Sequence, residues 1–213
     1  MSVRAATATL AMLALCACAC SSGRSASGPP ANAAGNGPSK TVLLLGGRSS
    51  DGDGIADRLR DAWPYRVFDA LPRSTVFVNN ARDQATVAEA LSEQVPLSRD
   101  LKPDLVEVWL GADDVAAGTP LPAFMRDLSR LIVMLRAAGA GRILVGDLPP
   151  AYGAATARYN DAIHRVVRDG GAELVSLSRA GINLGSPREG RLPDAASQPV
   201  IAAAFTTAIN AHS

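Results

Sequence analysis

The amino-acid sequence predicts an α/β domain of three layers, α/β/α, built around a five-stranded parallel sheet. Two observations lead to this fold class. Short apolar runs alternate with longer segments in which apolar residues recur at helical spacing, and Gly or Pro residues separate them. Such alternation is typical of parallel sheets that are covered by helices on both faces.

The predicted strands are apolar almost throughout, as expected for strands that are buried on both faces. The first reads TVLLLG, and the strand that follows Pro103 reads DLVEVWL. The segments predicted as strands are residues 41–46, 76–79, 104–110, 142–146 and 173–177, and residues 65–69 are interpreted as a further short strand.

The predicted helices end at Pro or Gly, which are common stop signals. The clearest spans residues 121–138, where Phe124, Leu128, Leu131 and Leu135 have helical spacing and Gly139 follows. The other predicted helices are residues 55–63 (ended by Pro64), 85–95 (ended by Pro96), 154–168 and 199–211.

The place of a binding site also follows from this fold class. Open parallel sheets bind ligands beyond the carboxyl ends of their strands. In this chain those ends are residues 46–53, 79–85, 111–114 and 146–152. Trp63 and Trp109 fall at an element end and in a buried strand, so we expect them to pack in the core.

Composition excludes several classes of function. The chain has 21 basic and 20 acidic residues, which gives no electrostatic reason to expect nucleic acid as a partner. No phosphate-binding glycine motif is present. The Asp51–Gly54 run DGDG resembles part of a calcium loop, but Arg60 stands where an EF-hand needs its bidentate Glu. We therefore expect no metal and no cofactor.

The amino terminus has the layout of an export signal. Residues 5–17 form an apolar stretch too short to span a bilayer, and the following LCACACSSG resembles the lipobox of bacterial lipoproteins. We therefore interpret residues 1–20 as a lipoprotein signal peptide, with Cys20 as the lipidated residue and Cys18 as the alternative. The alternative interpretation is a plain secretory signal.

This interpretation implies export and anchoring by lipid, such as palmitate, at the outer face of the cell membrane. Residues 21–40 are rich in Ser, Gly, Pro and Ala and are predicted to be a flexible tether. Residues 41–213 form the predicted folded domain. All three cysteines of the chain, Cys16, Cys18 and Cys20, precede that domain, which excludes a disulfide framework or a cysteine metal site in it.

At the predicted strand ends the chain resembles the SGNH (GDSL-type) hydrolase family, whose fold is flavodoxin-like. The resemblance covers residues 41–210, and each segment matches a family block in order. The segments are VLLLGGRSSDG (42–52), VNNARDQATVAEAL (78–91), PDLVEVWLGADD (103–114), ILVGDLPP (143–150), YNDAI (159–163) and EGRLPDAASQPVIAAAF (189–205). The family implies esterase, lipase or acyltransferase chemistry by Ser, Gly, Asn and His, with an Asp three residues before the His.

The residues at those functional positions depart from the family pattern. The nucleophile position is Arg48, the oxyanion Gly and Asn positions are Gln84 and Asp113, and the Asp and His of the last block are Glu189 and Leu192. Ester hydrolysis needs a nucleophile, a base and oxyanion donors. Arg48 cannot act as the nucleophile, Leu192 cannot take a proton, and Asp113 would place negative charge where the oxyanion forms. The framework residues are kept, namely Gly46, Gly52, Ala85, Gly111, Asp114 and Pro193.

Other residues of the chain are poorly placed to take over the lost roles. A one-residue slip would make Ser49 the nucleophile, and Ser50 is a second candidate, but His212 is beside the terminus and His164 lies mid-helix near Asn160 and Asp161. We expect His164 to be a satisfied surface or core residue.

Three hypotheses follow from these residues. The first is a non-catalytic binding or accessory module with an unidentified envelope ligand or protein as partner. The second is a slow esterase or acyltransferase that uses Ser49 or Ser50 with a carboxylate as the base, and the third is a structural envelope lipoprotein. The candidate cleft consists of Arg48, Ser49, Asp113, Asp114 and Glu189. In it we expect Arg48 to pair with Asp113 or Glu189, the alternative being that Arg48 points into solvent.

Overall fold

A computed structural model describes residues 40–185 and 191–211, all of which belong to one compact unit. The predicted signal peptide, Cys16, Cys18, Cys20, Glu189 and His212 lie outside the described residues. In the described part of the chain, no helix is both long and apolar enough to cross a membrane.

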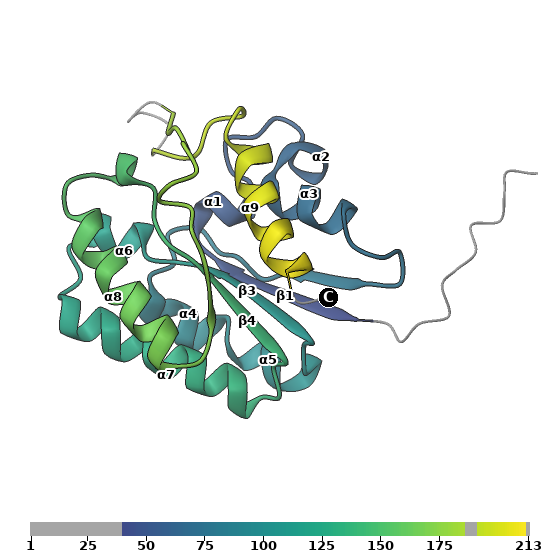
Figure 1. Ribbon diagram of the computed structural model, residues 1–213, viewed down its shortest axis with the longest axis horizontal. Coiled ribbons are helices and arrows are strands. Elements are labelled where there is room, and N and C mark those ends of the chain that lie inside the picture. The colour runs from purple at the N-terminus through teal and green to yellow at the C-terminus, as the bar shows by residue number, and fades with distance from the viewer. Residues whose placement is uncertain (1–39, 186–190, 212–213) are drawn as a thin grey trace, which may run out of the picture. The chain divides into compact units, whose positions relative to one another are not determined.

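The fold class is the predicted one. Five parallel strands form a sheet in the order β2-β1-β3-β4-β5, with helices on both sides (Figure 1). The strands are β1 (Thr41–Gly46), β2 (Val76–Asn79), β3 (Leu105–Trp109), β4 (Arg142–Gly146) and β5 (Glu173–Val175).

The helices form the two outer layers. The short α2 (Arg58–Asp61), α3 (Trp63–Asp69) and α9 (Gln198–Asn210) lie on one side of the sheet (Figure 1). The other side carries α4 (Val87–Glu93), α5 (Pro96–Leu101), α7 (Leu121–Ala137) and α8 (Thr156–Asp169). Three short helices follow strand ends, namely α1 (Arg48–Asp51), α6 (Ala112–Ala117) and the 3₁₀ turn η1 (Pro150–Tyr152).

One predicted strand is wrong. Residues 65–69 belong to α3, and of the predicted helix 55–63 only α2 forms. Pro64 does not end a helix but lies in the first turn of α3, where its missing N–H costs nothing. Trp63 and Val67 then lie four residues apart and are both fully buried.

Pro96 has the same effect, because it begins the unpredicted helix α5 instead of only ending the one before it. The preceding helix α4 starts at a capping box, in which Thr86 and Glu89 each bond the other's main-chain N–H. Helices α7, α8 and α9 differ from their predicted bounds by one or two residues.

Both tryptophans pack in the core, as predicted. The ring of Trp63 stacks on Phe205 with centroids 4.6 Å apart and meets Trp109 edge-on at 5.8 Å. Trp63 therefore joins α3 and α9 to the sheet. The central strand β3 also places an acidic residue in the core, because Glu107 is fully buried.

Candidate functional site

The candidate residues lie at the carboxyl ends of β1 and β3, which are neighbouring inner strands of the sheet. The strand order reverses between these two neighbours, which is where ligand sites form in open α/β sheets. Arg48 and Ser49 open α1 directly after β1, and Asp113 and Asp114 lie in the first turn of α6 after β3. Glu189, the fifth expected cleft residue, is outside the described residues.

Arg48 pairs with two carboxylates that the sequence did not single out. Its Nε donates to Oδ2 of Asp53 at 2.6 Å and lies 3.3 Å from Oδ1 of Asp83. The hydrogen bond with Asp53 raises the pKa of Arg48 and lowers that of Asp53. The expected pair with Asp113 does not form, although Asp113 is near enough to act on Arg48 electrostatically.

The reason for this difference is the turn that follows α1. Gly52 adopts a left-handed conformation with φ of +83°, which folds Asp53 back beside Arg48. Asp53 and Asp83 both lie in segments that the strand ends had marked, residues 46–53 and 79–85. The acidic residues in those segments were therefore the sequence signal that could have predicted the partners of Arg48.

Asp113 is a half-buried carboxyl group in acidic surroundings. Burial, followed by the charges of Asp114, Asp83 and Glu89, raises the pKa of Asp113 to about 6. Its carboxylate lies against the main chain of Gly47, where a Cβ would stand 2.6 Å from Oδ2. The Gly at position 47 thus makes room for the acid at position 113.

Asp114 has a structural role, because it links α6 to α4. It is buried, and its Oδ2 accepts a hydrogen bond of 2.9 Å from the N–H of Val87, at the start of α4. Burial raises the pKa of Asp114. This hydrogen bond connects the first turn of α6 to the start of α4.

Neither candidate serine hydroxyl is hydrogen-bonded to a base among the described residues. The Ser49 hydroxyl is 3.1 Å from the Tyr152 hydroxyl, and burial raises the pKa of Tyr152 to about 12. Tyr152 is therefore neutral near pH 7 and cannot take a proton from Ser49. The Ser50 hydroxyl is fully buried beside Gly46 and has no hydrogen-bond partner among the described residues.

Gln84 keeps a backbone conformation that favours glycine. Its φ is +54°, which is uncommon for a residue with a side chain, and its side chain is exposed. In the resemblance described above, position 84 corresponds to the Gly that binds the oxyanion in the family. The backbone of Gln84 therefore has a conformation that Gly adopts freely, although the residue is Gln.

Leu192 is buried and lies against Gly54, where an added Cβ would stand 3.4 Å from Cδ1 of Leu192.

The space between Arg48, Asp113 and Tyr152 is a cavity of only about 10 Å³. A cavity of that size holds at most about one water molecule. Between these three side chains there is therefore no room for a ligand larger than water.

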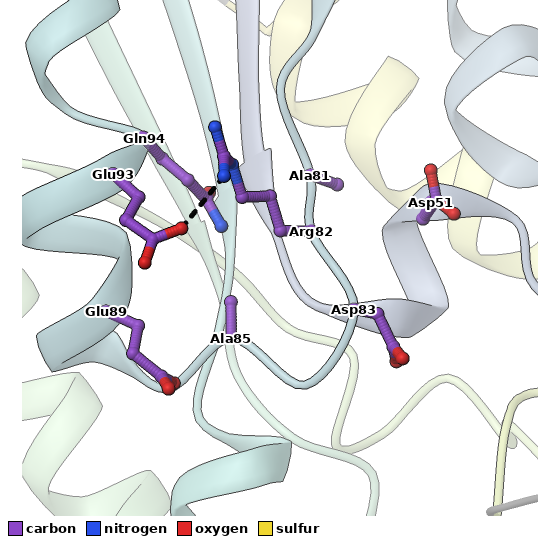
Figure 2. Close-up of a pocket in the computed structure, with 8 residues that line it drawn as sticks. All are labelled: Asp51, Ala81, Arg82, Asp83, Ala85, Glu89, Glu93 and Gln94. Carbon is purple, nitrogen blue, oxygen red and sulfur yellow. Dashed lines mark hydrogen bonds and ion pairs between the residues drawn. The ribbon is translucent and has the colours of Figure 1, made fainter.

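A larger hollow of about 460 Å³ lies beside it, between α1, the loop after β2, and α4. Figure 2 shows its lining, in which Arg82 reaches toward Glu93 and pairs with it at 2.9 Å. The lining residues are Asp51, Ala81, Arg82, Asp83, Ala85, Glu89, Glu93 and Gln94. The sequence did not predict this acidic hollow.

Gln94 holds the wall of that hollow against β1. Its side-chain amide accepts from the Gly46 N–H and donates to the Gly46 carbonyl, both at 3.0 Å, and it is fully buried. These two bonds supply partners to the main-chain groups of Gly46, the last residue of β1, whose carbonyl also accepts from the Arg82 N–H at 3.0 Å.

His164 has a hydrogen-bond partner, as expected of a satisfied residue. Its Nε2 lies 2.9 Å from Oδ2 of Asp147, a buried acid after β4 that the sequence did not single out as its partner. Asp147 also accepts from the N–H and the hydroxyl of Ser178 at 2.6 and 2.7 Å. Because Asp147 lies between Ser178 and His164, His164 is not placed to deprotonate that serine.

No group of three or more His, Cys, Asp or Glu side chains within residues 40–185 and 191–211 is arranged to hold a metal ion.

Comparison with known proteins identifies the family. The sequence model of the GDSL-like lipase/acylhydrolase family matches residues 44–199, and the chain belongs to that family. An arylesterase of Vibrio mimicus is 28% identical over 132 residues, which are 60% of this chain and 64% of that protein. The match thus spans less than two thirds of that relative.

Solved structures share the fold of this chain. The psychrotrophic esterase EstA from a Pseudoalteromonas species has a TM-score of 0.68 at 24% identity, covering 81% of this chain and 98% of that one. TesA has the same TM-score at 25% identity, covering 81% and 99%. Axe2, an acetylxylan esterase from Geobacillus stearothermophilus, has a TM-score of 0.68 at 16% identity, covering 80% and 94%, and shows the shared fold alone.

Proposed function

We propose that this chain is a non-catalytic member of the GDSL family. It works as a binding or accessory module of the bacterial envelope, anchored at the outer face of the membrane by a lipid on Cys20 or Cys18. The observation that carries the proposal is Arg48, which opens α1 directly after β1, where the family has its nucleophilic serine. A guanidinium held by Asp53 and Asp83 cannot attack an ester.

The other catalytic roles are also unsupported by these residues. Leu192, at the position of the base, has no group that could take a proton. Asp113, at the position of an oxyanion donor, is mostly ionised at neutral pH because its pKa is about 6. A carboxylate there repels the negative charge that develops during ester hydrolysis.

The alternative is a slow esterase that uses Ser49 or Ser50. Two observations speak against it, because the Ser49 hydroxyl is hydrogen-bonded to the neutral hydroxyl of Tyr152 and not to a carboxylate, and the Ser50 hydroxyl is fully buried. The arylesterase and esterase relatives keep this alternative worth testing.

The test is hydrolysis of short-chain aryl esters by the purified protein, with the Ser49→Ala variant as the matched control. We expect the rate to equal the uncatalysed background for both proteins. A rate above background that disappears in Ser49→Ala would overturn the proposal in favour of the esterase.

A second measurement separates a binding module from a structural protein. The purified protein is used to capture lipids, glycans and proteins from envelope extracts, and Arg48→Ala serves as the comparison. A binding module that uses the carboxyl ends of β1 and β3 should retain a defined ligand. The Arg48→Ala variant should lose that ligand. Capture of nothing would favour the structural hypothesis.

A further inference from the structure

The outer edge of the sheet at β2 has main-chain groups that face away from the domain. β2 is the edge strand, and the N–H groups of Val76 and Asn80 donate to the carbonyls of Lys40 and Leu44 at 2.8 and 3.0 Å. Because alternate residues of a strand bond to opposite neighbours, the N–H and C=O of Phe77 point away from β1. No described strand lies on that side.

The sequence of this edge lacks the usual protection against strand pairing. Residues 74–81 read STVFVNNA and contain no charged residue and no proline. Exposed edges are normally blocked by charge, by proline, by a bulge or by a covering element. The nearest charged residues, Arg73 and Arg82, lie just outside this segment.

Apolar side chains are exposed on both faces of the edge. On the face of α3, the ring of Phe68 is 37% exposed and stacks on Phe77 with centroids 5.4 Å apart, and Tyr65 meets Phe77 edge-on at 6.2 Å. On the opposite face Val76 is 48% exposed. A second strand added at this edge would cover apolar surface above and below the sheet.

We propose that a second copy of this chain pairs with β2 in antiparallel orientation, about a two-fold axis at Phe77. The two five-stranded sheets then join into one continuous sheet. A two-fold axis brings the same patch of both copies together, so the patch must be self-complementary.

The register about Phe77 meets that requirement. Phe77 faces its own copy, and the two residues exchange N–H···O bonds through the groups that point away from β1. Val76 faces Val78 of the second copy, which pairs two β-branched side chains on each side of the axis. Arg73 falls opposite Ala81, so no like charges meet along the paired segment.

An unrelated extended peptide could also add to an open edge. The self-complementary register favours a second copy, because one sequence supplies both apolar pairs and avoids charge repulsion. The paired segment is short, since β2 has four residues. The dimer should therefore be weak and depend on concentration.

The test is sedimentation equilibrium of the purified full chain in a density-matched detergent. We expect a concentration-dependent mass that approaches twice that of the monomer. Val76→Lys should raise the dissociation constant at least about tenfold, because it places a charge in an apolar pair. Val133→Lys is the matched control, since Val133 on α7 is 60% exposed and far along the chain from β2.

Cross-linking tests the register independently. A Cys at position 77 would face its own copy with Cα atoms about 5.5 Å apart, which suits a disulfide. We expect Phe77→Cys to cross-link under mild oxidation more than the wild-type chain and Val133→Cys do. A chain that stays monomeric up to about 1 mM, or a dimer that Val76→Lys leaves intact, would overturn the proposal.

Discussion

At the scale of single residues, Arg48 shows how a charge is accommodated at the mouth of the candidate cleft. Its side chain is 34% exposed, and those of Asp53 and Asp83 are 45% and 57% exposed. Ion pairs at such positions stabilise a fold by only ~0–1 kcal/mol. Their main effect is therefore to orient Arg48 and to tie the turn after β1 to the loop after β2.

Gln84 gives a prediction at the same scale. Its φ of +54° costs a residue with a Cβ roughly 1 kcal/mol. We therefore expect Gln84→Gly to be more stable than Gln84→Ala by about 1 kcal/mol, measured by urea unfolding.

Position 129 provides the control for that prediction. Ser129 is exposed in the middle of α7, where Ala should be more stable than Gly by ~0.8–1 kcal/mol. If the order of Gly and Ala is the same at both positions, Gln84 does not have the strained conformation described above.

At the scale of elements, the central strand β3 contains an acid in the core. Glu107 is fully buried, and neither carboxyl oxygen has a hydrogen-bond partner among the described residues. Burial raises the pKa of Glu107 to about 8, so it is protonated in the folded state at neutral pH. In the unfolded chain the same group ionises near pH ~4.3.

The pH dependence follows from that difference. Above about pH 4.3 the unfolded state releases the proton while the folded state keeps it, so Glu107 lowers the stability of the fold as pH rises. The loss is complete once the pH passes about 8, where the folded state also ionises. We expect Glu107→Leu to be more stable than wild type at about pH 8, by at most about 5 kcal/mol.

The measurement is urea unfolding of both proteins at several values between about pH 4 and about pH 9. The gain should shrink toward the acid end, because both states of wild type are then protonated. Glu107→Gln should remove the same pH-dependent part while leaving a buried polar group. Unfolding free energies that differ by a constant amount across this range would show that Glu107 does not titrate as described.

At the scale of the whole molecule, the proposed lipid anchor gives a prediction about where in the cell the protein is found. We expect replacement of Cys18 and Cys20 together by Ala to move the protein from the membrane fraction to the soluble fraction. A lipidated cysteine with several acyl chains anchors stably, whereas an unlipidated chain has no such attachment. Fractionation followed by immunoblotting measures this, with Ser21→Ala and Ser22→Ala as neighbouring substitutions that should leave the protein on the membrane.

The sequence alone determined the fold class, and it also determined that the candidate residues lie at the carboxyl ends of the strands. Strand runs such as LLLG and VEVWL are apolar because both faces are buried, and that pattern is local and therefore readable. The ordered blocks likewise predicted the family that the comparison with known proteins identified. Helices shorter than two turns, such as α1 and α6, were missed because they have too few residues for a helical period.

Only the tertiary structure decided which charges meet. Arg48 could have reached any of several acids, and the left-handed turn at Gly52 selected Asp53 over Asp113. Pro64 is equally compatible with the end and the start of a helix, and the docking of Trp63 on Phe205 settled it. The first choice depends on the conformation of one turn, and the second depends on a contact between segments far apart in the sequence, whose energy a local pattern does not contain.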